Sequence, residues 1–155
     1  MRKRKPKLRV IAPDPRYGDP MVTQFVNMMM LEGKKSTAFK VFYDAMDIIK
    51  ERSEGDEHAV WKKALNNAMP QVEVRSRRIG GATFQIPMQI RPDRKISTAM
   101  KWLISFARKR NEKSMASKLA AEVLAAAKEE GAAVKKRTDT HKMAEANKAF
   151  SHFRF

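Results

Sequence analysis

The chain has 155 residues, no cysteine and a net charge of +16, because 33 lysines and arginines face 17 acidic residues. This length allows a substantial core without staples, and the lack of cysteine excludes disulfides and thiolate metal sites. The charge favours a polyanion partner, since binding relieves self-repulsion and releases counterions. No apolar run reaches the ~18 residues of a membrane span and no signal-peptide core follows the basic start, so we expect a cytoplasmic protein without membrane contact.

The positive charge is gathered in four segments. Residues 1–16 carry seven basic side chains and one acid, and residues 72–95 carry six and two. Residues 108–118 carry five basic side chains and one acid, and residues 135–155 carry six and two. Residues 44–57 are the reverse, with six acids and two basic side chains. We therefore expect several surfaces that bind nucleic acid, and an acidic face turned away from it.

Residues 1–17 are predicted to be a basic N-terminal extension, because prolines interrupt the lysines and arginines. Contact with nucleic acid is the favoured role, and a solvated tail is the alternative. Residues 18–155 are predicted to form a single helical domain with an arm at residues 72–90. Apolar residues at helical spacing and cap residues predict six helices in it. Their expected positions are 20–33 after Asp19, from about 36 through 49, from Asp56 to Pro70, from Asp93 to 110, 114–130 closed by Gly131, and about 138–150.

Strand-type alternation is confined to residues 72–90, on both sides of Gly80 and Gly81. This segment predicts a β-hairpin between the third and fourth helices. The expected fold class is therefore mainly α, a six-helix bundle with one protruding β-hairpin. A free two-stranded ribbon is marginal in water, so the apolar base of the hairpin should pack on the helices while its basic tip projects.

The register of the hairpin depends on the length of its loop. A three-residue loop ending at Ala82 sets Arg77 opposite Gln85 and separates an apolar face from a basic face. A two-residue glycine loop sets Arg77 opposite Phe84 and mixes the faces, so the three-residue loop is the prediction. Phe84 has two open interpretations, stacking on an unpaired base or covering its own hairpin.

No catalytic residue, metal site or cofactor is expected. The string Gly33-Lys34-Lys35-Ser36 lacks the earlier glycine and the preceding strand of a P-loop, and the three histidines have no carboxylate or cysteine at ligand spacing. Two lysines and a hydroxyl at a helix start are instead a candidate phosphate contact, with a solvated turn as the alternative.

Residues 108–114 join two predicted helices and combine dense positive charge with a helix N-terminus. Phosphate binding is favoured here over a solvated loop. Replacing Arg108 and Arg110 with alanine should then weaken binding and lower its salt dependence. Trp61 and Trp102 fit apolar helix faces, so both are predicted to pack in the core rather than stack on bases.

Seven strings along the whole chain carry a family resemblance. They are residues 13–15, 33–38, 70–81, 107–110, 113–116, 133–137 and 141–150. In this order they closely resemble the bacterial form of the small-subunit ribosomal protein seven family. The resemblance implies a structural protein that binds the 3′ major domain of small-subunit ribosomal RNA, nucleates assembly of the subunit's head and lines the exit site. Implied partners are this RNA, exit-site transfer RNA, messenger RNA and the neighbouring proteins nine, eleven and thirteen, and no obligate homo-oligomer is expected.

The resemblance also implies two sets of site residues. Contacts with ribosomal RNA are expected at Arg2, Lys3, Arg4, Lys5, Lys7, Arg9, Lys34, Lys35, Ser36, Arg75, Arg91, Arg94, Arg108, Lys109, Arg110, Lys113, Ser114 and Met115. Contacts with exit-site transfer RNA and messenger RNA are expected at Arg77, Arg78, Gly80, Gly81, Phe84, His141, Met143 and Asn147. The alternative from another class is an architectural DNA-binding protein, because a basic β-arm with a proline also suits the minor groove.

Overall fold

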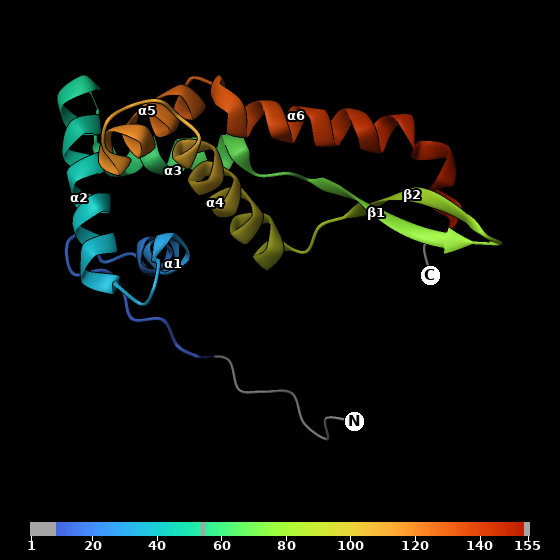
Figure 1. The fold of residues 1–155 in the computed structure, drawn as a ribbon, viewed down its shortest axis with the longest axis horizontal. Helices are drawn as coiled ribbons and strands as arrows, with labels where there is room; N and C mark the ends of the chain where they lie inside the picture. The colour runs from blue at the N-terminus through green and yellow to red at the C-terminus, as the bar shows by residue number, and fades with distance from the viewer. Residues whose placement is uncertain (1–8, 54, 154–155) are drawn as a thin grey trace. The chain divides into compact units, whose positions relative to one another are not determined.

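A computed structural model describes residues 9–53 and 55–153 (Figure 1). Within them, six α-helices and a two-stranded antiparallel sheet lie in the predicted order, with the hairpin between the third and fourth helices. This confirms the predicted fold class. The elements are α1 (Pro20–Met29), α2 (Lys35–Arg52), α3 (Glu57–Ala68), β1 (Val72–Ile79), β2 (Ala82–Gln89), α4 (Pro92–Arg108), α5 (Met115–Ala127), α6 (Gly131–Ala146) and the final 3₁₀ helix η1 (Lys148–Phe153).

The chain divides into two compact units, residues 1–40 and residues 41–155. In the first unit, the Asp19 carboxylate accepts a hydrogen bond from the Met21 amide at 2.8 Å, and Pro20 occupies the first turn of α1. The predicted start of this helix is therefore confirmed. Its end is not, because α1 stops at Met29 and the extended Met30 leads into a left-handed turn that contains Gly33. The predicted division into an extension and a single domain stays a prediction.

The core of the second unit forms where α3, α4 and α5 pack together. Trp61 of α3 is fully buried, as predicted. Its ring centroid lies 5.8 Å from that of Phe42 in an edge-on arrangement and 5.9 Å from the stacked ring of His58. Asp56 caps α3 by accepting the Ala59 amide, which confirms the predicted start of the helix. The buried pair of Trp61 and Phe42 supplies a large apolar burial at a fixed geometry.

The start of α4 differs from the prediction that Asp93 caps it. Arg91 is the N-cap residue and makes no side-chain cap bond, while Pro92 occupies the first turn and Asp93 follows within it. Proline suits this position because it has no amide hydrogen to leave unpaired and its φ angle is already helical. The helix therefore begins two residues earlier than an Asp93 cap implies, and Asp93 still acts on the positive end of the helix dipole.

The junction of α5 and α6 also differs from the prediction. Gly131 was expected to end the fifth helix, but α5 ends at Ala127 and Gly131 is the first residue of α6, seven residues before the predicted start. The end of α5 is closed by the Glu130 amide, which donates to the Ala125 carbonyl at 2.9 Å. The first turn of α6 is satisfied by the Glu122 carboxylate, which accepts the Ala133 amide at 2.9 Å. Ala125 and Glu122, which both lie in α5, thus set the position of the junction.

Replacing Gly131 with alanine is expected to destabilise the protein by about 1–3 kcal/mol, because a residue with a side chain is strained at positive φ. The φ angle of Gly131 is +88°, and an added Cβ would lie 3.1 Å from the Cβ of Ala125. Chemical denaturation measures the loss. Gly55 is the matched control, since an added Cβ there meets nothing within 4 Å. Equal stability of the two variants would contradict the prediction.

The hairpin register is the two-residue alternative, so the predicted three-residue loop is wrong. Arg77 lies opposite Phe84, and Arg75 lies opposite Ile86. Gly80 and Gly81 have φ angles of +57° and +91°. Positive φ at both positions is the requirement of a type I′ turn, whose twist matches that of the strands. Turn geometry therefore outweighs the separation of apolar and basic side chains onto two faces.

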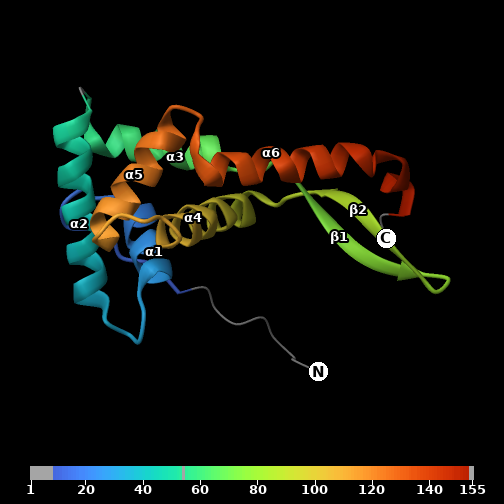
Figure 2. The same cartoon turned by 45° about the horizontal axis from the view of Figure 1, so that its top comes forward.

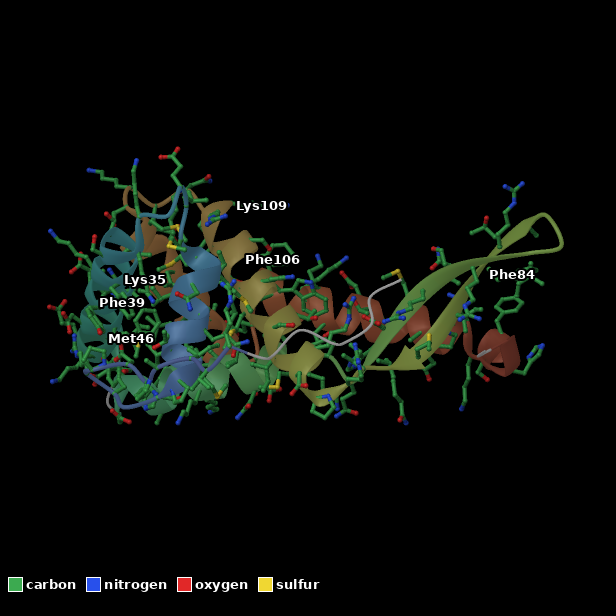
Figure 3. The ribbon with its side chains drawn as sticks, turned by 90° about the horizontal axis from the view of Figure 1, so that it is seen from below. Lys35, Phe39, Met46, Phe84, Phe106 and Lys109 are labelled. Carbon is green, nitrogen blue, oxygen red and sulfur yellow. The ribbon has the colours of Figure 1, made fainter. Side chains whose placement is uncertain are left out.

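Burial in the hairpin instead differs between its base and its tip. Ile86 is 1% exposed and Ile90 is 6% exposed, whereas residues 75–78 and 80–83 are exposed. The predicted apolar base and basic tip are therefore present. The base is covered by α6, which runs along β1, and by η1, which lies against β2 (Figures 1 and 2). Phe84 of β2 packs on Phe150 of η1 at 5.2 Å between centroids (Figure 3), which favours the packing interpretation of Phe84.

Candidate nucleic-acid interface

The turn between α4 and α5 carries a cluster of exposed cations, which we call the junction cluster and define as Arg108, Lys109 and Lys113. The Lys109 ammonium lies 5.5 Å from the centre of the Phe106 ring (Figure 3). Ser114 caps α5 by accepting the Ser117 amide at 3.1 Å, as the predicted helix start requires. Dipole and side chains thus present positive potential on one surface, which is the chemistry of a phosphate site. Met115, another predicted contact, is the half-buried first residue of α5.

Arg110 has a different environment from the junction cluster. Its Nε donates to Glu122 Oε2 at 2.8 Å, and its Nη1 lies 3.3 Å from Glu112 Oε1. The Glu122 side chain is only 1% exposed and its other oxygen accepts the Ala133 amide. Arg110 therefore neutralises a buried carboxylate that joins α5 to α6. Sequence reasoning missed Glu122, although an acid at an apolar position of the helix, beside Leu119 and Val123, is a usable signal.

A second group of predicted contacts lies at the base of the hairpin. The Glu73 carboxylate accepts from Arg75 Nε at 2.8 Å and from Arg94 Nε at 2.9 Å, which ties β1 to the start of α4. Partial burial by itself would raise the pKa of Glu73, but the hydrogen bonds and charges of Arg94 and Arg75 outweigh it and lower the pKa. Arg91 is exposed beside them. Glu73 was missed by the sequence reasoning and orients two of the arginines that it singled out.

The residues expected at the exit site form two groups. Arg77, Arg78, Gly80 and Gly81 are exposed at or near the tip of the hairpin. The α6 residues lie elsewhere, because the Nε2 of His141 accepts the Gln71 amide at 3.0 Å, just before the base of β1. On the same helix Met143 is 46% exposed, and the Asn147 side chain donates to the Met143 carbonyl at 2.8 Å. Phe84 connects the two groups, because it lies opposite Arg77 in the sheet and packs on Phe150, three residues after Asn147.

The bond from Gln71 to His141 makes the stability of the second unit depend on pH. Burial lowers the pKa of His141 from its ordinary 6.5, and the positive charge of Arg137 lowers it further. Protonated Nε2 cannot accept the bond, and the unfolded chain binds the proton at higher pH than the folded chain. The bond therefore stabilises the folded chain fully above about pH 6.5. Its contribution is lost as the pH falls through the lowered pKa of His141 in the folded state.

We expect the free energy of unfolding to fall between pH 7.5 and pH 5.5, and to fall less in the His141→Gln variant. Chemical denaturation at a series of pH values measures both. His152→Gln is the matched control, because His152 is exposed and takes no part in the bond between Gln71 and His141. An identical pH dependence of the wild-type protein and the His141→Gln variant would contradict the assignment.

In the first unit, the predicted phosphate contact lies at the start of α2. Lys34 Nζ forms an exposed ion pair with Glu32 at 2.7 Å. Lys35 is the first residue of α2 and its ammonium lies 5.8 Å from the centre of the Phe39 ring (Figure 3), while Ser36 is exposed. Arg9 is exposed as well. The other predicted contacts of the extension, Arg2, Lys3, Arg4, Lys5 and Lys7, lie outside the described residues.

Residues 9–53 and 55–153 contain neither a membrane-spanning helix nor a metal-binding cluster. No helix in these ranges is long and apolar enough to cross a membrane. The same residues contain no group of three or more histidine, aspartate or glutamate side chains that could hold a metal ion.

A helical scaffold that displays exposed cations on a hairpin and at a helix junction is typical of structural proteins that bind RNA. The family described as ribosomal protein S7p/S5e matches residues 1–148. The chain is 75% identical over 158 aligned residues to small ribosomal subunit protein uS7 of Christiangramia forsetii, with all of both chains covered. It is 73% identical to the uS7 protein of Flavobacterium johnsoniae and 58% identical to that of Bacteroides fragilis, again with full coverage of both chains.

The chain therefore belongs to the S7p/S5e family of ribosomal proteins, and it is a protein of the small ribosomal subunit. This confirms the family resemblance that the seven strings predicted. It also confirms that the chain is not an enzyme, because the family consists of structural ribosomal proteins. RNA binding and a part in translation follow from the same membership.

Proposed function

We propose that the chain binds the 3′ major domain of small-subunit ribosomal RNA in the cytoplasm and nucleates assembly of the head of the subunit. The observation that carries the proposal is the junction cluster, three exposed cations around a capped helix N-terminus in a chain of charge +16. Phosphates supply the affinity of such a surface, while the rigid helices hold the cations at fixed positions that suit one RNA shape.

The arginines at the base of the hairpin supply a second RNA contact in this proposal. Glu73 ties Arg75 of β1 to Arg94 of α4, and Arg91 is exposed just before α4. An RNA helix seated there is bound by side chains whose directions are set before binding, which limits the entropy lost on association. The lysines at the start of α2 and the basic extension add contacts within the first unit.

The tip of the hairpin has a separate role in the proposal, at the exit site beside transfer RNA and messenger RNA. The exposed Arg77 and Arg78 suit phosphate contacts there. The exposed part of α6, including Met143, would meet transfer RNA, messenger RNA or a neighbouring small-subunit protein. Proteins nine, eleven and thirteen are the proposed neighbours. The protein acts as a single copy and not as an obligate homo-oligomer.

Competition binding tests the main proposal. A labelled fragment of the 3′ major domain should be displaced by the same unlabelled RNA and not by duplex DNA at equal concentration, and the protein should sediment with small subunits. Displacement by duplex DNA would favour the architectural DNA-binding alternative and overturn the ribosomal RNA assignment.

Replacing Arg77 and Arg78 with serine is expected to leave the affinity for the 3′ major domain fragment within about threefold, because each removes one exposed charge far from the junction cluster. The Gly80-Gly81 turn stays intact in this variant. Retention of deacylated transfer RNA by reconstituted subunits should fall instead. A collapse of RNA-fragment binding would contradict this division between tip and junction.

A further inference from the structure

A cavity of about 320 Å³ lies among the base of the hairpin, α4 and α6. Its apolar wall is formed by Pro70, Val74 and Ile90, and one side is the indole of Trp102. Its volume is at the lower end of the range of small-molecule pockets, so it suits one flat group rather than an extended chain. None of the residues that line it belongs to the junction cluster.

Trp102 differs from the other tryptophan of the chain, and the prediction that both pack in the core holds only for Trp61. Trp61 is fully buried and lies against two other rings. Trp102 is half-buried, lines the cavity and makes no ring contact and no indole hydrogen bond within residues 9–53 and 55–153. The Thr98 hydroxyl, one turn earlier on α4, also makes no hydrogen bond in these ranges. An aromatic surface and two unused polar groups thus lie in one cavity.

Two cations complete the cavity. Lys136 of α6 is exposed and forms no ion pair within the described part of the chain. Arg94 of α4 is bonded to Glu73, which also lines the cavity, and that carboxylate is shared with Arg75. Lys136 and Arg94 therefore outweigh the single acid that lines the cavity. The cavity combines an apolar slot for a ring with positive charge at its edge.

We propose that this cavity binds one unpaired nucleotide of RNA, with its base against Trp102 and its phosphate at Lys136 and Arg94. Proteins recognise unpaired bases by stacking them on aromatic side chains and by binding their phosphates with cations. Thr98 and the Trp102 indole offer hydrogen bonds to the edge of the base. An apolar side chain from a protein partner would fill the slot but leave Lys136 without a counter-charge. The inference rests on the proposed function, since it gives ribosomal RNA a further contact.

Tryptophan fluorescence of the full chain tests the inference. Acrylamide should quench the half-buried Trp102 and not the fully buried Trp61. Addition of the 3′ major domain fragment should shield Trp102 from acrylamide. Replacing Trp102 with leucine should weaken binding of this RNA by about 5- to 150-fold, the range for the loss of one stacked base. The Trp102→Phe variant keeps an aromatic surface and should retain most of the affinity.

Tyr43→Leu is the matched control, because Tyr43 is also half-buried on a helix of the second unit but does not line the cavity. Circular dichroism of each variant checks its folding. If the Trp102→Leu variant does not fold, acrylamide quenching of the wild-type protein tests the inference instead. Normal RNA binding with Trp102 still open to acrylamide overturns the inference and leaves the proposed function intact. Shielding by small-subunit proteins and not by RNA also overturns it. No binding of the RNA by the wild-type protein overturns both.

Discussion

Replacing Arg110 with alanine is expected to destabilise the protein by about 2–4 kcal/mol. Removing one partner of a buried ion pair costs ~3–5 kcal/mol because the other charge is left uncompensated, and the lower range applies here because Arg110 is itself 29% exposed. Glu122 would then lie 1% exposed with no cation against it. A loss of this size lowers the melting temperature by roughly 5–15 °C in a chain of this length.

A double-mutant cycle separates the ion pair from general damage to the α4–α5 turn. The Glu122→Gln variant removes the charge but keeps an oxygen for the Ala133 amide. We expect Arg110→Met combined with Glu122→Gln to be more stable than Arg110→Met alone, because no buried charge is left unpaired. Lys113→Ala, three residues away in the same turn, is the matched control and should change stability by less than about 0.5 kcal/mol, because Lys113 is exposed. Purely additive losses would contradict the proposed pairing.

The ion pair of Arg110 with Glu122 corrects one expectation drawn from the sequence. Arg108 and Arg110 were expected to contact phosphate together, since they are two residues apart in one basic run. The pairing of Arg110 with Glu122 spans twelve residues, so no local pattern around Arg110 reveals it. The apolar neighbours of Glu122 indicate that it is buried, but they do not reveal that its second oxygen fixes the start of α6. Loss of RNA binding in the Arg110→Ala variant would therefore report the folding of the junction and not a phosphate contact.

Local signals in the sequence were sufficient for the elements and most helix starts. Asp19, Asp56 and Ser114 each accept an amide hydrogen of the helix that follows, as their positions predict. These bonds depend only on neighbours two or three residues away. Such short-range chemistry is legible from spacing alone.

Where two local rules compete, the sequence does not show which is stronger. In the hairpin, separation of apolar and basic faces favoured a three-residue loop, but the twist of a two-glycine turn decided the register. Gly131 is compatible with the end of one helix or the start of the next, and contacts from Ala125 and Glu122 decide between them. Trp102 fits an apolar helix face, yet the depth of its burial depends on how β1 and α6 pack around it.

Replacing Arg108, Lys109 and Lys113 together with alanine is expected to give the largest change in RNA binding. Each phosphate contact contributes about 0.7–0.9 to the slope of log affinity against log salt concentration, so the slope should fall by roughly 2–3 in total. All three side chains are exposed, whereas Arg110 is bonded to a buried acid. The fold should therefore survive, and the loss of affinity should be greatest at low salt and shrink as salt rises.

The matched control removes the same charge from other places on the second unit. Lys50, Lys63 and Lys128 are exposed on or next to α2, α3 and α5, and none was predicted to contact RNA. Both triple variants lower the net charge from +16 by three, so long-range attraction is weakened equally. Counterion release, however, counts only cations in contact with phosphate. An equal fall of the slope in the two variants would mean that the junction cluster acts through net charge alone, whereas a fall confined to the first variant assigns the phosphate contacts to the turn between α4 and α5.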